Sequence, residues 1–168
     1  VGAFGGSREV MSHVAPLGPV YQGGTLSGNP LATAAGLAVL DQLSVDRYDE
    51  LISKATLLAD GMAEAIGSAG VAVQVPRVGP LLGVFFADAP VRNYDDAKAA
   101  ADSGRYAPFF HSMLDQGVAL APGAYEAMFP SLAHTDADIQ RTIDAAGTAA
   151  TDLTQVLGSG PNTSDPGE

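Results

Sequence analysis

The segment whose residue types best suit binding chemistry is a glycine-rich loop, YQGGTLSGNP, at residues 21–30. Its glycines let the backbone approach a ligand closely, and Thr25 and Ser27 add hydroxyl donors. Asn29-Pro30 predicts the start of a helix, whose first N–H groups and positive dipole end suit a phosphate or a carboxylate. On composition alone, however, a turn that only caps the helix is the favoured interpretation.

A single acid, Glu126, marks the second candidate position. It lies between Tyr125 and the apolar run Ala127-Met128-Phe129, in an otherwise apolar segment. Such a carboxylate either faces solvent from an alternating strand or is a buried acid oriented for proton transfer. The residues alone favour the solvent-facing interpretation.

Other residue types that often carry chemistry give weaker signals. The three histidines, at positions 13, 111 and 134, match no metal-ligand spacing and are expected at the surface or at caps. Lys54 and Lys98 lie in polar surroundings that would leave their amines solvated. The absence of cysteine excludes disulfides, thiolate metal sites and a cysteine nucleophile. No metal site is therefore expected.

The composition bounds the class of protein. The chain has 168 residues, 46% of them hydrophobic, which is enough to build a core in one domain or in a piece of a larger one. Its net charge of −11 argues against general binding of nucleic acid or of an anionic membrane. No apolar run reaches the roughly 18 residues of a membrane span, and no basic leader opens the chain, so we expect a cytoplasmic protein. Because the sequence starts at Val1 within an apolar, glycine-rich stretch, we expect a C-terminal fragment.

The first elements that must position these residues are two helices. A short strand at 1–4 and a helical turn at 8–13 are expected to precede a helix at 31–43, which is apolar on nearly every side and therefore predicted to be buried. Asp46 is expected to cap a second helix that runs to about Ser68. Its apolar positions recur with helical spacing. They are Tyr48, Leu51, Ile52, Ala55, Leu58, Met62 and Ile66.

Beyond residue 70, the pattern predicts a small unit of strands covered by helices. Segments 71–75 and 81–86 are expected to pair as a hairpin, and segment 93–104 is a loop or a mobile helix. A capping box of Thr135 and Asp138 predicts the start of the last helix. Short strands are also expected at 118–120 and 125–129. The apolar positions expected on the 106–116 helix and on the last helix are Tyr106, Phe109, Phe110, Met113 and Leu114, then Ile139, Ile143, Ala146, Ala150, Leu153 and Leu157.

Several segments together resemble the glutamate-1-semialdehyde 2,1-aminomutase family, a pyridoxal-phosphate-dependent branch of the class III aminotransferases. The matching segments are VGAFGGSREVM at 1–11, APLGPVYQGGTLSGNP at 15–30, YAPFF at 106–110, APGAYEAMF at 121–129 and SLAHT at 131–135. The motif at 25–30 is shared with related class III aminotransferases. The segment around Glu126 favours the aminomutase, since the related enzymes carry an arginine there and none lies between Arg105 and Arg141.

The resemblance implies a fold and a domain organisation. The fold class is α/β, as the C-terminal part of a type I pyridoxal-phosphate transferase fold. Residues 1–44 would end the large cofactor-binding domain, 45–69 would form a linking helix, and 70–157 would form a small α+β C-terminal domain. Residues 158–168 are expected to be a disordered tail, because their composition is Gly, Pro, Ser, Thr, Asn and acid.

The resemblance also implies roles for particular residues. Thr25 and the backbone of Gly24 would bind the phosphate of pyridoxal 5'-phosphate in the neighbouring subunit of a homodimer. Tyr21 would lie at the same subunit boundary, and Glu126 would lie near the cofactor and the substrate amine. The sequence departs from the family at three positions: Gly24 replaces a common Ala, Gly123 replaces Ser, and Met128 replaces Gly or Trp. These departures affect the expected pocket near Glu126 most.

The implied activity is an isomerase reaction on a small-molecule substrate, with no nucleic acid or membrane involved. The family converts glutamate-1-semialdehyde to 5-aminolevulinate by intramolecular amino transfer, a step of tetrapyrrole synthesis. Its Schiff-base lysine lies directly before the segment that matches Val1, so this chain alone is expected to be inactive. Two alternatives stay open: a class III aminotransferase with an external amino donor, and a non-catalytic remnant that only dimerises.

Overall fold

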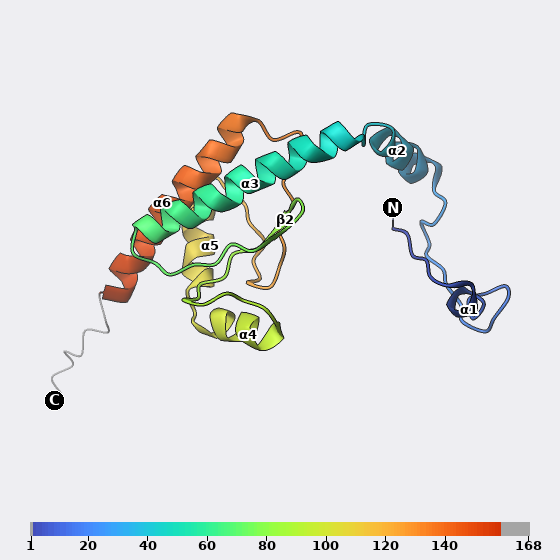
Figure 1. The fold of residues 1–168 in the computed structure, drawn as a ribbon, viewed down its shortest axis with the longest axis horizontal. Helices are drawn as coiled ribbons and strands as arrows, with labels where there is room; N and C mark the ends of the chain where they lie inside the picture. The colour runs from blue at the N-terminus through green and yellow to red at the C-terminus, as the bar shows by residue number, and fades with distance from the viewer. Residues whose placement is uncertain (1, 159–168) are drawn as a thin grey trace, which may run out of the picture. The chain divides into compact units, whose positions relative to one another are not determined.

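Two compact units divide the chain, Val1–Arg47 and Tyr48–Glu168. The computed structural model describes residues 2–158, and Figure 1 shows the order of their elements. The expected tail at 158–168 lies outside the described residues, except for Gly158, which ends the last helix. Within the described part of the chain, no helix is long and apolar enough to cross a membrane.

The first unit contains two helices, each with a side-chain cap. Helix α1 (Arg8–Met11) is capped by Ser7, and α2 (Pro30–Leu40) is capped by Asn29, whose Oδ1 accepts hydrogen bonds from the next two free amides. The predicted cap and proline start of α2 are confirmed, although α2 ends three residues earlier than expected. The predicted strand at 1–4 is wrong over residues 2–4, because no other strand pairs with that backbone.

The prediction that the helix now seen as α2 is buried is also wrong for this chain. No residue between 2 and 47 is buried, and the Leu31 and Leu37 side chains are 83% and 61% exposed. A helix that is apolar all round needs cover on several sides. The other apolar side chains of residues 2–47, such as Phe4, Val10 and Leu17, are themselves exposed and do not give it.

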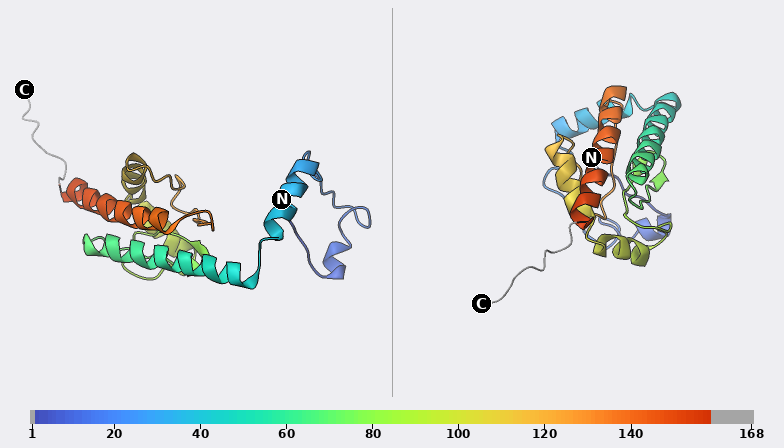
Figure 2. Two further views of the ribbon diagram at one scale, coloured as in Figure 1. Left: turned by 90° about the horizontal axis from the view of Figure 1, so that it is seen from above. Right: turned by 90° about the vertical axis from the view of Figure 1, so that its left-hand side faces the viewer.

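The second unit has a true core, built around three helices. Helix α3 (Val45–Ser68) runs beside α6 (Asp136–Gly158), and α5 (Tyr106–Asp115) packs on α6 (Figure 2). The α3–α6 approach is close, since a Cβ added at Gly61 would lie 2.4 Å from Ile143 Cδ1. The largest fully buried side chains are Phe109, Met62, Ile66, Met113 and Leu153.

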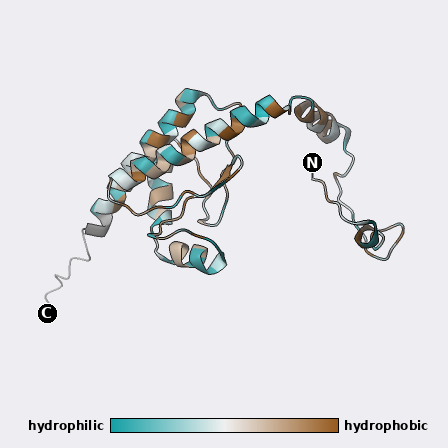
Figure 3. Ribbon diagram, viewed as in Figure 1, coloured by the Kyte–Doolittle hydropathy of each residue, from teal (hydrophilic) through white to brown (hydrophobic). Residues whose placement is uncertain are grey.

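Helix α3 follows its predicted pattern with two corrections. Ser44, not Asp46, caps it, because the Ser44 hydroxyl accepts a hydrogen bond from the Arg47 amide at 3.3 Å. Tyr48, predicted on the apolar face, is 45% exposed because it lies in the first turn, before α3 reaches the core. Figure 3 shows hydrophilic and hydrophobic residues alternating along α3. The expectation that residues 45–69 link two domains stays a prediction, while the buried face of α3 belongs to the second unit.

The strands are fewer and shorter than expected. Strand β1 (Arg77–Val78) pairs antiparallel with β2 (Leu81–Leu82), and a single bridge joins Gln74 to Phe85. The predicted hairpin is therefore present, but its first strand lies at 77–78 and not at 71–75, where only Gln74 is paired. Residues 118–120 form no strand, and segment 125–129 contributes only the bridge between Met128 and Leu82. Apart from that bridge, neither segment pairs with a neighbouring strand, which a regular strand requires.

The remaining helices are α4, α5 and α6, and each tests a prediction made from the sequence. The polar segment 93–104 forms helix α4 (Tyr94–Asp102), because Asn93 caps it. The predicted capping box of α6 is confirmed, since the Thr135 amide and hydroxyl both donate to Asp138 Oδ2. The predicted stripe of α6 is buried from Ile139 to Leu153, and the Leu157 side chain lies outside the description. On α5, Leu114 is 45% exposed, contrary to prediction, because α6 covers the opposite side of that helix.

Candidate functional site

The glycine-rich loop forms a tight turn directly before α2. The Ser27 amide donates to the Gly24 carbonyl at 2.9 Å, and the Asn29 amide donates to the Leu26 carbonyl at 3.1 Å. Gly28 has a φ of +73°, a conformation that side chains other than glycine rarely adopt. The chain can therefore turn at this point and place Asn29 as the cap of α2.

The turn leaves hydrogen-bond donors open to solvent. Within residues 2–158, the amides of Gly24 and Thr25 donate to no other group, and the exposed Thr25 hydroxyl has no hydrogen-bond partner. No lysine or arginine lies between Arg8 and Arg47, and no acid lies between residues 10 and 40. An anion in this loop would be held by neutral donors without a competing carboxylate, so these residues fit a phosphate group.

Tyr21 lies beside this turn within the first unit. Its side chain is 84% exposed, and its hydroxyl lies over the Gly23 backbone, where an added Cβ would be only 2.6 Å from the tyrosine oxygen. At the next position, a Cβ on Gly24 would be 3.0 Å from Ser27 Oγ. The structure thus brings Tyr21, Gly24 and Thr25 into one exposed loop, as the sequence positions require.

Glu126 lies in the second unit, on a loop that the core holds at both ends. Before it, the buried Tyr106 hydroxyl donates to the Ala121 carbonyl at 2.7 Å. After it, Met128 and Leu82 exchange backbone hydrogen bonds of 2.7 and 3.2 Å. The Glu126 side chain itself is exposed, as the residues alone had favoured.

The Glu126 side chain folds back over Gly123. The Glu126 amide donates to the Gly123 carbonyl at 3.1 Å, and a Cβ at position 123 would lie 3.3 Å from both Cγ and Oε1 of Glu126. A serine here, as in many members of the family that the sequence resembles, would press on the carboxylate. The departure at position 123 therefore changes the space around Glu126.

Electrostatics connect Glu126 with the core. Burial raises the pKa of the Tyr106 phenol, and the negative charge of Glu126 raises that pKa further. Outside the core, the Tyr94 ring of α4 stacks on Tyr125, with ring centres 6.0 Å apart and planes 20° apart. The sequence predicted Tyr106 as core but gave no signal for its hydrogen bond, because its partner lies 15 residues away.

Neither lysine has a free amine in this structure. Lys54 is not the solvated side chain that was expected: its side chain is 17% exposed, and its Nζ donates to the His134 carbonyl at 2.9 Å. The fold brings the start of α6 over this part of α3, which the sequence of α3 could not reveal. Lys98 pairs with Asp102 one turn along α4, and that hydrogen bond raises the pKa of the lysine.

The three histidines are exposed, as expected. His134 Nδ1 accepts a hydrogen bond from the Ser131 amide at 3.0 Å, so its ring stabilises a local turn. Within residues 2–158, no group of three histidine or acidic side chains could hold a metal ion.

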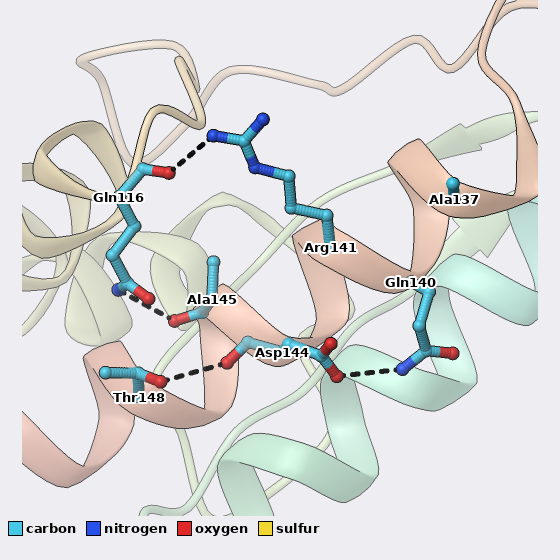
Figure 4. Close-up of a pocket in the computed structure, with 7 residues that line it drawn as sticks. All are labelled: Gln116, Ala137, Gln140, Arg141, Asp144, Ala145 and Thr148. Atoms are coloured by element: carbon cyan, nitrogen blue, oxygen red, sulfur yellow. Dashed lines mark hydrogen bonds between the residues drawn. The ribbon is translucent and has the colours of Figure 1, made fainter.

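An open pocket of about 430 Å³ lies between α5 and α6 (Figure 4). Its polar groups are already paired: Arg141 donates to the Gln116 carbonyl, Gln116 to the Ala145 carbonyl, and Gln140 to Asp144 Oδ1. None of the candidate residues lines it. We interpret the contacts of Arg141 and Gln116 as a clamp between the end of α5 and helix α6.

The sequence matches one known family of enzymes and many of its members. The sequence profile of the class-III aminotransferases matches residues 1–149. The glutamate-1-semialdehyde 2,1-aminomutase of Desulfosudis oleivorans is 50% identical over 154 residues, which are 91% of this chain and 36% of that protein. The enzyme of the same name from Desulforamulus reducens is 52% identical over 147 residues, 87% of this chain and 34% of its own length. The chain thus spans about a third of these relatives.

Solved structures agree on the fold. A β-phenylalanine aminotransferase from Variovorax paradoxus is 28% identical with a TM-score of 0.73, covering 90% of this chain and 35% of its own. An omega-transaminase from Sphaerobacter thermophilus is 25% identical with a TM-score of 0.70, covering 89% and 35%. A glutamate-1-semialdehyde-aminomutase from Pseudomonas aeruginosa shares the fold at 23% identity, with a TM-score of 0.67 and coverage of 86% and 33%. The expected fold class, α/β as part of a larger transferase fold, is confirmed.

Proposed function

The chain belongs to the class-III aminotransferase family. On that premise we propose that it forms part of a pyridoxal-phosphate-dependent aminomutase. The reaction is intramolecular amino transfer that converts glutamate-1-semialdehyde to 5-aminolevulinate. The observation that carries the proposal is identity of about 50% with aminomutases of that name over nine tenths of this chain. Because the chain spans about a third of those relatives, it would contribute only part of the active site.

In this proposal the glycine-rich loop binds the cofactor phosphate. The open amides of Gly24 and Thr25 and the Thr25 hydroxyl would donate hydrogen bonds to its oxygens. When bound, pyridoxal 5'-phosphate supplies an electron sink for the bond changes at the amino-bearing carbon. Following the family pattern, this loop would serve the neighbouring subunit of a homodimer, with Tyr21 at the subunit boundary.

Glu126 would act on the substrate side. Its exposed carboxylate can accept hydrogen bonds from a substrate ammonium group, and it can hold a proton near the reacting amine. The anchors at Ala121 and Met128 limit how far that carboxylate can move. Positioning of this kind is what an intramolecular transfer needs, because the amino group has to reach the adjacent carbon of the same substrate.

The covalent lysine would come from outside these 168 residues. Lys54 is held by the His134 carbonyl and Lys98 is paired with Asp102, so neither amine is placed to bond a cofactor. We therefore expect the isolated chain to be inactive with substrate and cofactor. Formation of 5-aminolevulinate by the purified 168-residue chain would contradict this.

A chimera tests the proposal directly. The matching part of the Desulfosudis oleivorans aminomutase is replaced by this chain, and 5-aminolevulinate formation from glutamate-1-semialdehyde is measured without any added amino donor. We expect activity that falls about 100-fold or more in Glu126→Gln, where the carboxylate is replaced by an amide of the same size. Exposed Gln42→Glu is the control for a change of charge elsewhere. A folded, cofactor-bound chimera without activity would refute the proposal.

The second candidate is an aminotransferase that uses an external donor. What supports it is the likeness to the β-phenylalanine aminotransferase, which is 28% identical over 90% of this chain. The same chimera discriminates: sustained transfer from an added amino acid to an added keto acid would support this candidate. A dimer that forms without either activity would support a non-catalytic role.

A further inference from the structure

The start of the loop that carries Glu126 is bound to the core by the side-chain hydroxyl of Tyr106. Tyr106 lies in the first turn of α5 and is only 8% exposed. Its ring packs beside Phe109, with ring centres 6.5 Å apart, and its hydroxyl donates to the Ala121 carbonyl at 2.7 Å. Ala121 is the first residue of the segment that leads to Glu126. Tyr106, a residue of the core, thus holds the first residue of this exposed loop in place.

Between this anchor and the Met128 pairing with Leu82, the loop has little freedom. Only six residues separate Ala121 from Met128, and the turn from Gly123 to Glu126 lies within them. The Glu126 side chain returns over Gly123, toward the anchored end of the loop. A shift of the Ala121 carbonyl would therefore be passed to the Glu126 carboxylate rather than absorbed in the loop.

We propose that Tyr106 is a positioning residue, whose hydroxyl acts through Ala121 to set where the Glu126 carboxylate stands. The catalytic consequence rests on the proposed function of Glu126; the structural consequence does not. Without the hydroxyl, the half-buried Ala121 carbonyl loses its partner in the core and turns toward water, because a carbonyl removed from water is costly to leave unpaired. The ring of Tyr106 would stay in place, since its packing does not depend on the oxygen.

Tyr106→Phe in the 168-residue chain is the first test, with Tyr48→Phe as the matched control because Tyr48 is 45% exposed and lies on α3. Amide hydrogen exchange is measured at Glu126, whose N–H donates to the Gly123 carbonyl within the loop, and at Met128, whose N–H donates to the Leu82 carbonyl of β2. We expect about fivefold faster exchange at both in Tyr106→Phe and no change in Tyr48→Phe. Equal exchange in the two variants would overturn the proposal.

A second measurement leaves the core intact. In Glu126→Gln, the carboxylate that raises the pKa of Tyr106 is removed, so the phenol should titrate at lower pH than in the unchanged chain. NMR of tyrosines labelled at the phenol carbon follows this titration, and Tyr106→Phe identifies the signal. An unchanged Tyr106 pKa would place Glu126 out of reach of Tyr106 and would also overturn the proposal.

The chimera separates this inference from the proposed function. There, Tyr106→Phe should lower kcat about tenfold and leave KM within about twofold, because the substrate is still bound but the acid is misplaced. Tyr48→Phe should change neither. If the exchange and titration results hold but the chimera is inactive, the function fails and the positioning stands. If the chimera is active and Tyr106→Phe matches Tyr48→Phe in kcat, the positioning role fails and the function stands.

Discussion

Helices α2 and α6 are both rich in alanine, yet only one of them is packed. Helix α6 buries Ala145, Ala146, Ala149 and Ala150 together with Leu153, and a glycine at 147 faces Ala65 of α3. No residue of α2 is buried. The difference lies in the other residues: α6 alternates its small residues with Asp, Thr and Gln, while α2 has apolar residues on nearly every side.

The comparison shows what an amphipathic pattern supplies and what it does not. A helix with one apolar face can be satisfied by one neighbouring layer, which α5 and α3 give to α6. A helix that is apolar all round can be satisfied only by cover on several sides. Thus the second unit has a buried core, whereas the exposed side chains of α2 predict poor solubility for the chain expressed alone.

The largest expected contrast is in amide hydrogen exchange. An unpacked helix of 11 residues is marginal in water, so the α2 amides should exchange within about 10-fold of the unprotected rate. Buried stretches of α3 and α6 should be protected by about 1,000-fold or more. Exchange of the 168-residue chain followed by mass spectrometry gives both values at once. Strong protection of the α2 amides would contradict the contrast between the two helices, since it would mean that α2 is packed against other residues.

The second contrast compares truncations of one side chain in each unit. Phe109 is fully buried and meets Phe86 edge-on at 5.1 Å, so Phe109→Ala should lower the free energy of unfolding by about 3–5 kcal/mol. Leu31 is 83% exposed, so Leu31→Ala should change it by less than about 0.5 kcal/mol. Urea denaturation followed by circular dichroism measures both. A loss above 1 kcal/mol for Leu31→Ala would argue against the exposed state of α2.

The smallest contrast concerns the helix caps and depends on pH. Hydrogen bonds from the Thr135 hydroxyl and amide lower the pKa of Asp138 from its ordinary value of 3.8. Because the folded form has the lower pKa, the carboxylate stabilises the fold fully above pH 3.8. That stabilisation disappears as the pH falls through the lowered pKa. Asp138→Asn should therefore lower the melting temperature at pH 7, with the difference vanishing in strong acid.

The cap of α2 provides the control for this pH dependence. Asn29 carries no titratable group, so Asn29→Ala should loosen α2 equally at all pH values and leave the melting of the second unit unchanged. If Asp138→Asn showed the same loss at every pH, the carboxylate would not be the group that stabilises the start of α6.

Much of the fold could be read from local pattern. The start of α2 at Asn29-Pro30, the capping box of α6, the buried face of α3 and the hairpin after residue 70 all depend on residues within a few positions of each other. The sequence also indicated the candidate residues Tyr21, Gly24, Thr25 and Glu126, through a resemblance that the family match and the identities support. Their roles remain predictions.

The sequence by itself therefore determined most of the helices, the caps of α2 and α6 and the family of this chain, because each is encoded in short-range patterns or in identity. Only the tertiary structure decided that the apolar α2 stays exposed, that Lys54 meets the His134 carbonyl 80 residues away, and that Tyr106 holds the loop of Glu126. Contacts of this kind join residues that no period or motif connects. They form because a buried polar group must find a partner wherever the packing of the core places one.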